Sequence, residues 1–249
     1  MISTTAFSIA QDERIVTRLA LSNNHVLTPA VSKNINLNAV TYKTDTVQLV
    51  MVGNADGTDA YILYGTALNG ISLTEATNPK NFNLHDVAVS SGTYIAVGNA
   101  DGTDAYIITS SNASSWTERA NPKNFNLTCV DANLAVAVAG GFPDGTDAYL
   151  VRSADSGATW SEITNANNGT ISDIFYSSYH NAWIAVGGTN LAATYILRST
   201  DNGVSFSQIS TPNINSLGII CEVPGNHHLL ALADGILTNQ FLKSVDGGL

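Results

Sequence analysis

Short apolar runs separated by polar turn residues dominate the chain. Between residues 86 and 119, runs of about four residues rich in Val, Ile, Tyr and Ala alternate with Gly, Asn, Asp and Ser, which predicts four strands at 86–89, 94–97, 105–108 and 116–119. The first two runs are almost continuously apolar and the fourth is polar, as expected when inner strands are covered on both faces and the last strand lies outermost. No segment carries the apolar stripe of a helix.

The same four-strand unit recurs along nearly the whole chain. The segment Asn34-Ile35-Asn36-Leu37 returns at 81–84, 124–127, 168–171 and 213–216, at spacings of about 43 to 47 residues. A β-rich repeat of this length is typical of a propeller blade. We therefore predict an all-β fold, a five-bladed β-propeller of four-stranded antiparallel blades, formed by residues 26–249.

The two ends of the chain bear on how such a ring would close. The fifth repeat supplies strands at 217–222, 228–233 and 240–243 and then stops, whereas residues 26–30 align with 73–77 and 116–120 in the outer strands of other repeats. We expect residues 26–30 to complete the last blade. Residues 15–18 also resemble a third strand, so a sixth, incomplete blade stays open. Residues 1–25 are predicted as an N-terminal arm or extra strand, through which copies could associate.

One turn sequence, Asp-Gly-Thr-Asp, appears in three successive repeats between the second and third strands. Asp-Gly between apolar strands predicts a tight hairpin, because Gly accepts a positive φ. Antiparallel connectivity places these turns on the same face as the Asn-Pro-Lys-Asn connections between blades. Repeated carboxylate, amide and ammonium groups there could bind a glycan with multivalent gain, or could simply be good turn and cap residues. The candidate ligand-binding residues are Asp56, Asp59, Asp101, Asp104, Asp144, Asp147, Lys80, Asn81, Lys123 and Asn124. One such loop offers too few oxygens for Ca²⁺, so no metal site is predicted.

A second motif, S-x-D-x-G-x-x-W/F, lies between the third and fourth strands. An Asp can accept backbone N–H bonds within such a turn while Gly takes the left-handed position. The motif resembles the Asp-box, or BNR repeat, of sialidase-like β-propellers. In that family the box is structural and lies away from the active face, so the resemblance implies the fold and no activity. The residues that match are Ser153, Asp155, Gly157, Trp160, Ser199, Asp201, Gly203, Phe206, Ser244 and Asp246.

Composition narrows the function. The 249 residues are 44% hydrophobic and 12% charged, with a formal charge of −10, and no cluster of Lys and Arg is present to bind nucleic acid. No stretch is long and apolar enough for membrane insertion, and no classical signal peptide is evident. The two cysteines, Cys129 and Cys221, are expected to be free buried thiols. No cofactor is predicted.

Catalysis is not expected either. The sialidase resemblance would imply an arginine triad, but Arg152 and Arg198 occupy equivalent positions before Asp-boxes on the opposite face. A generic glycosidase needs two facing carboxylates. Glu75, Glu118 and Glu162 fall instead on predicted outer strands.

These features favour a non-enzymatic surface-binding or structural module, of the kind found on virus or phage particles, attached to a glycan or to another structural protein. The expected location is a virion or an extracellular surface. A free-standing multivalent lectin is the alternative, and a glycoside hydrolase is a third reading that would require an acidic pair.

Overall fold

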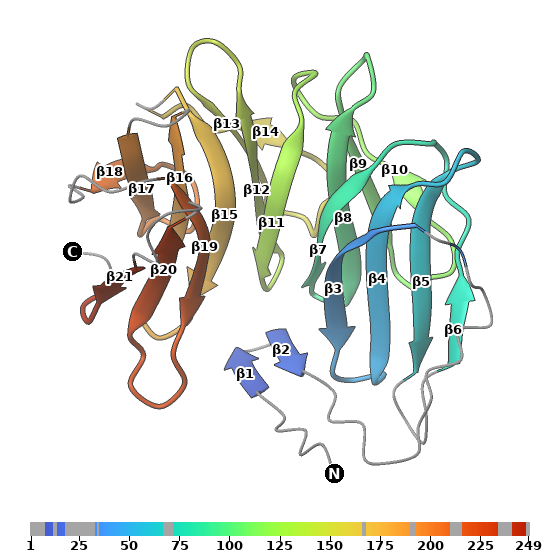
Figure 1. Cartoon of the computed structure of the whole chain (residues 1–249), viewed down its shortest axis with the longest axis horizontal. Coiled ribbons are helices and arrows are strands. Elements are labelled where there is room, and N and C mark those ends of the chain that lie inside the picture. The colour runs from blue at the N-terminus through green and yellow to red at the C-terminus, as the bar shows by residue number, and fades with distance from the viewer. Residues whose placement is uncertain are drawn as a thin grey trace.

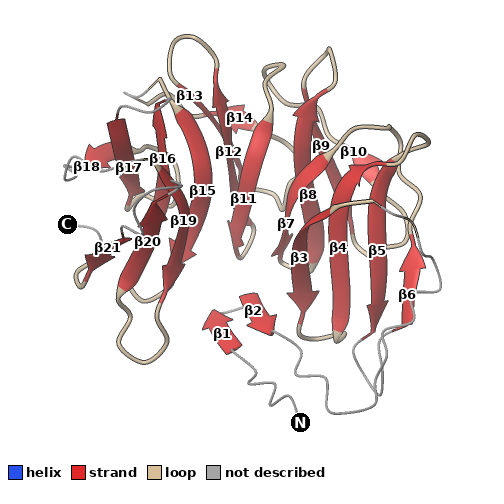
Figure 2. Ribbon diagram, in the orientation of Figure 1, coloured by secondary structure: helices blue, strands red, loops and turns tan. Residues whose placement is uncertain are grey.

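The computed structural model of the chain describes residues 8–11, 14–17, 33, 35–66, 72–165, 168–189, 193–209, 216–233 and 241–247. All regular secondary structure in these ranges is β-strand (Figure 2). Within the same ranges, no helix is present that would be long and apolar enough to span a membrane.

Five antiparallel sheets, here called blades 1 to 5, follow one another in chain order. Blade 1 contains β3 (Leu37–Lys43), β4 (Gln48–Ala55), β5 (Ala60–Thr66) and β6 (Ser72–Glu75); blade 2 contains β7 (Leu84–Ser90), β8 (Thr93–Ala100), β9 (Ala105–Ser110) and β10 (Thr117–Glu118). Blade 3 contains β11 (Leu127–Asn133), β12 (Val136–Pro143), β13 (Ala148–Ser153) and β14 (Ser161–Glu162); blade 4 contains β15 (Thr170–Ser177), β16 (Ala182–Thr189), β17 (Ala193–Ser199) and β18 (Ser207–Ile209). Blade 5 contains β19 (Leu217–Glu222), β20 (Leu229–Ala233) and β21 (Phe241–Ser244). The four strands predicted within the second repeat, and their order, are confirmed.

The core lies between the blades. Alternate side chains of one blade point forward to the next blade and backward to the previous one, so each pair of neighbours shares an apolar layer. Between blades 1 and 2, for example, Val52 and Ile62 pack with Val87 and Tyr106, all at most 2% exposed. The blade 2–3, 3–4 and 4–5 layers are built in the same way. Burial on both faces explains the continuous apolar runs of the inner strands.

A repeated glycine positions the second strand against the connection that precedes each blade. A Cβ added at Gly53, Gly98, Gly141 or Gly187 would lie only 1.9–2.1 Å from a backbone oxygen of the connection. That oxygen belongs to Asn36, Asn83, Asn126 or Thr170, the third residue of the recurring four-residue segment. Each approach sits at a shift in the register between the first two strands. The recurring segment therefore marks a β-bulge, and the residue opposite the bulge on the second strand has to be glycine because a side chain there would clash with the backbone.

The turns separate into two faces, as the connectivity predicts. Figure 1 shows the first-to-second turns, such as those of β3–β4 and β11–β12, at the lower edge and the second-to-third turns at the upper edge. The upper edge carries the Asp-Gly-Thr-Asp turns and is here called the clasp face. The lower edge carries the first-to-second turns and the Asp-boxes and is here called the box face.

The ends of the chain meet only some of the sequence expectations. Blade 5 has three strands in the described ranges, and residues 26–30, predicted to complete it, lie outside those ranges, so this closure stays a prediction. Residues of the extra third strand expected at 15–18 are found in β2 (Arg14–Thr17), which pairs with β1 (Ser8–Gln11) as a separate two-stranded sheet. In Figure 1 this hairpin lies between blade 1 and blade 5, which stand on opposite sides of the view.

Candidate functional site: three repeated clasps

Each Asp-Gly-Thr-Asp turn is held by its own first carboxylate. Asp101 Oδ1 accepts backbone N–H bonds from Thr103 at 2.8 Å and from Asp104 at 3.1 Å, and Asp56 and Asp144 make the same pair of bonds in their turns. Gly102 has φ +99° and open space around its Cβ position, so glycine is needed there for its conformation alone. The tight hairpins predicted from the sequence are confirmed.

The second oxygen of that carboxylate binds a lysine from the connection that enters the blade. Lys80 Nζ donates to Asp101 and, at 2.5 Å, to Glu118 on the outer strand β10. Lys33 bridges Asp56 and Glu75 in blade 1, and Lys123 bridges Asp144 and Glu162 in blade 3. The side chains of the three turn aspartates are at most 4% exposed. We call each lysine with its Asp and Glu a clasp.

Each clasp shifts the pKa of its lysine and of its turn aspartate. Hydrogen bonds from Lys33 and Lys123 lower the pKa of Asp56 and of Asp144 to about 2, and the backbone N–H bonds within the turn add to the effect. The same contacts raise the pKa of Lys33, Lys80 and Lys123 above the ordinary lysine value. The lysine and the turn aspartate of each clasp are therefore ionised at neutral pH, and they neutralise each other.

The second aspartate of the turn and the asparagines of the connection join neighbouring blades. Asp59 Oδ2 accepts the N–H of Asn78 at 3.1 Å, and Asn78 Oδ1 accepts the hydroxyl of Tyr106, a residue of the next blade, at 2.8 Å. Asn81 Oδ1 accepts the N–H of Gly57 at 3.1 Å. The blade 2–3 junction repeats this arrangement with Asp104, Asn121, Tyr149, Asn124 and Gly102. Burial raises the pKa of Asp59 and of Asp104.

The predicted ligand-binding residues are therefore brought together, but as bonded partners of one another. Asp104 and Asp147 are 8% and 3% exposed and accept backbone N–H bonds, and the first carboxylate of each turn already has lysine and backbone donors. This geometry gives the ten residues a structural role in joining connection, turn and outer strand. Glycan binding by the same residues stays a prediction.

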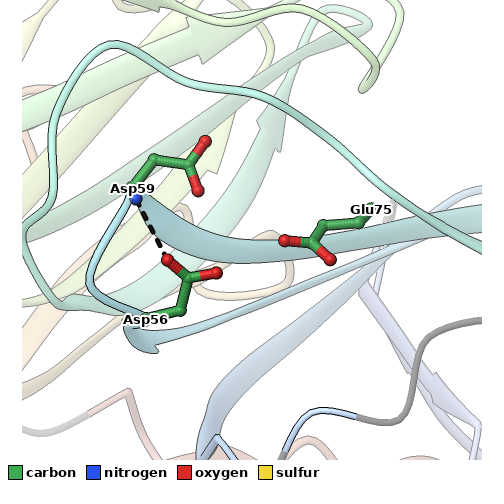
Figure 3. A group of neighbouring side chains, drawn as sticks. All are labelled: Asp56, Asp59 and Glu75. Carbon is green, nitrogen blue, oxygen red and sulfur yellow. Dashed lines mark hydrogen bonds between the residues drawn. The ribbon is translucent and has the colours of Figure 1, made fainter.

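Each of the first three repeats also brings three carboxylates close together. Ligand oxygens of Asp56, Asp59 and Glu75 lie within 4.8 Å of one another, as do those of the equivalent residues in blades 2 and 3 (Figure 3). Oxygen-only groups of this kind suit Ca²⁺. In each cluster, however, a lysine ammonium already contacts two of the three carboxylates, and it supplies the positive charge that a cation would bring.

The Asp-box residues form the expected local turns on the box face. Asp155 Oδ1 accepts the hydroxyl of Ser153 and the N–H of Thr159, both at 2.8 Å, and the indole of Trp160 donates to Gly157 O at 3.0 Å. Asp201 likewise accepts the hydroxyl of Ser199 and the N–H of Ser205, and Gly203 donates its N–H to the Ser199 hydroxyl oxygen. The bond from the Ser244 hydroxyl to Asp246 begins a third copy. The arginine before each of the two complete boxes reaches the next blade: Arg152 Nε donates to Asn202 O, and Arg198 Nε donates to Gly247 O. Phe206 is 8% exposed beneath its turn.

A cluster on the box face of blades 4 and 5 was not foreseen from the sequence. The exposed ring of Tyr179 stacks on His227 with centroids 4.0 Å apart and meets His180 edge-on at 4.9 Å. His227 Nδ1 lies 2.6 Å from Glu222, whose other oxygen accepts the Ser177 hydroxyl at 2.5 Å. The members come from two first-to-second turns one repeat apart. Their position in equivalent turns of successive repeats is the one feature of the sequence that could have indicated this cluster.

Comparisons with known proteins identify the fold. No protein-family model and no curated protein matches the chain. Among solved structures, YCF48 bound to a D1 peptide is similar over 88% of this chain and 70% of its own, with 12% identity and a TM-score of 0.59. A nidogen/laminin complex matches over 79% and 72% with 8% identity and a TM-score of 0.58, and the WD40 β-propeller domain of Doa1 over 82% and 64% with 11% identity and a TM-score of 0.55. The Asp-box resemblance holds for the local turns, and a sialidase-like family is not shown. The chain has the β-propeller fold.

Proposed function

We propose that the chain is a non-catalytic binding module of a virus or phage particle, or of another extracellular surface, and that its partner is a structural protein. The observation that carries this proposal is the contrast between its two faces. The carboxylates and ammonium groups of the clasp face are bonded to one another. The box face of blades 3 to 5 exposes large apolar side chains more fully than the clasp face, where Phe142 is 45% exposed.

Four such side chains extend from box-face turns. They are Leu134, Tyr179, Val204 and Val245, with exposed fractions of 74%, 64%, 61% and 63%. Tyr179 is held by its stack on His227, so its ring is presented with little loss of freedom on binding. Aromatic and apolar groups held on a rigid scaffold suit a protein partner, and tyrosine is among the residues enriched at binding hot spots.

The contacts around Glu222 support the non-catalytic part of the proposal. Ser177 and His227 both bind Glu222, and neither contact is of the hydroxyl-to-imidazole kind that activates a serine nucleophile. Two of the similar structures, YCF48 bound to a D1 peptide and a nidogen/laminin complex, contain a peptide or protein partner of the protein concerned. They agree with a protein partner here.

A photo-crosslinking residue at Val204 or Val245, in the cells that make the protein, would test the proposal. We expect cross-links to one structural protein from these positions and none from Thr103, the matched position on the clasp face. With that protein purified, Tyr179→Ala should weaken binding by about tenfold or more and Thr103→Ala should leave it unchanged. Cross-links from Thr103 alone would refute the assignment of the face. Glycan binding that is lost on replacing Asp59, Asp104 and Asp147 by Ala would favour the lectin alternative.

A further inference from the structure

The turn between the first and second strands of each blade contains a non-glycine residue with a positive φ. These residues, in blades 1 to 5, are Val47, Ser91, Leu134, Asn181 and His227, with φ angles of 53°, 43°, 51°, 47° and 55°. Asparagine and histidine adopt this left-handed region more readily than most residues, whereas a bulky aliphatic residue there is an outlier. Blades 4 and 5 therefore have residues that suit the position. Val47 and Leu134 do not suit it and are under strain.

The strain at Leu134 is not offset by burial of its side chain. Leu134 is 74% exposed, the highest value among the large apolar residues that the structure describes, whereas Val47 is partly buried. A leucine at this position therefore exposes apolar surface to water and also holds an unfavourable backbone conformation. Asn181 shows that the same turn position accepts a polar residue that suits it.

The backbone of the Leu134 turn is held from two sides. The hydroxyl of Ser90, a fully buried residue at the end of β7 in blade 2, donates to Leu134 O at 2.7 Å. The N–H of Ser156, in the Asp-box of blade 3, donates to Ala135 O at 2.8 Å. Strained conformations persist only where the surrounding structure holds them, and they cluster at functional sites. Because the turn is fixed before any partner arrives, little backbone freedom is lost on binding.

We propose that Leu134 is an anchor residue for the partner of the box face and that it inserts into an uncharged, apolar recess of that protein. This inference rests on the proposed function and adds the side chain that selects which partner fits. Such a recess removes from water the apolar surface that the chain itself leaves exposed. Burial of one leucine side chain strengthens binding by about tenfold or more. A charged partner surface would gain nothing from Leu134.

Three variants of the whole chain separate the strain from the binding. Leu134→Asn removes the apolar side chain and relieves the strain, so its melting temperature should rise by about 2–4 °C. Leu134→Ala removes the apolar side chain but keeps the unfavourable φ, and its melting temperature should stay close to that of the wild type. Leu134→Met keeps both features. Val204→Asn is the control for strain, because Val204 is 61% exposed on the same face without a positive φ, and its melting temperature should not change.

Binding would be measured by surface plasmon resonance on the purified structural protein that cross-links to position 204 or 245. We expect Leu134→Asn and Leu134→Ala to bind it about tenfold or more weakly than the wild type, and Leu134→Met to retain most of the affinity. A Leu134→Asn variant that is no more stable than the wild type would overturn this assignment alone, as would Asn and Ala variants that bind normally. The absence of any cross-link from the box face would overturn the proposed function and this assignment together.

Discussion

Replacing the clasp lysine of blade 2 tests whether the clasps stabilise the fold. In Lys80→Met the apolar stem keeps its packing, but Asp101, whose side chain is 0% exposed, loses its only cationic partner among the contacts described above. A hydrogen bond to a charged group contributes about 1.5–3 kcal/mol, and the loss leaves a buried charge with two backbone donors. Glu118 is 29% exposed and can turn to water, so loss of its ion pair with Lys80 should cost about 1 kcal/mol or less. We expect a loss of about 2–4 kcal/mol.

Urea unfolding followed by tryptophan fluorescence at neutral pH would measure this loss. The dependence of the unfolding free energy on urea concentration should be the same in wild type and variant, because both expose the same surface on unfolding. The control is Lys43→Met, which breaks an ion pair of 3.7 Å with the 64% exposed Asp45 and should cost about 1 kcal/mol or less. Adding Asp101→Asn to Lys80→Met should recover part of the stability, because no charge then remains buried. Equal effects of the two lysine variants, or a double variant that is less stable than Lys80→Met, would refute the reasoning.

Three further outcomes follow from the same structure. Gly141→Ala places a Cβ 1.9 Å from the backbone oxygen of Asn126 and should destabilise the fold by about 3 kcal/mol or more. Gly145→Ala has open space around the new Cβ but an unfavourable φ of +97°, and should cost about 1–2 kcal/mol. A lower melting temperature for Gly145→Ala than for Gly141→Ala would contradict this. Asp144 has a pKa of about 2 in the folded chain and about 3.9 unfolded, so its stabilisation is complete above about pH 4 and is lost as the pH falls toward 2. The difference in unfolding free energy between wild type and Asp144→Asn should therefore shrink over that range, and a constant difference would count against it. Trp160→Phe removes the hydrogen bond from the indole N–H to Gly157 O and should lower the unfolding free energy by about 1 kcal/mol in the same urea assay. An unchanged unfolding free energy would show that this bond does not stabilise the box turn.

Local sequence determined the strands, the turns and the repeat. Short apolar runs and the Asp-Gly turns between them are set by a few neighbouring residues. The strands from β7 to β10 and the Asp-box turns were therefore predictable without knowing what surrounds them. The recurring Asn-x-Asn segment also marked the bulge, although its glycine partner was not recognised. The candidate residues of the clasp face were located correctly as one face, because antiparallel connectivity alone orders the turns.

Which groups those residues bind was decided only by the tertiary structure. Lys80 meets Asp101 and Glu118 from 21 and 38 positions away, and no local pattern distinguishes a lysine that is free for a ligand from one that bridges two carboxylates. The same holds for burial. Val40 and Val87 occupy the same repeat position with the same side chain, yet one is 46% exposed and the other 2%, because exposure depends on whether a neighbouring blade covers the face.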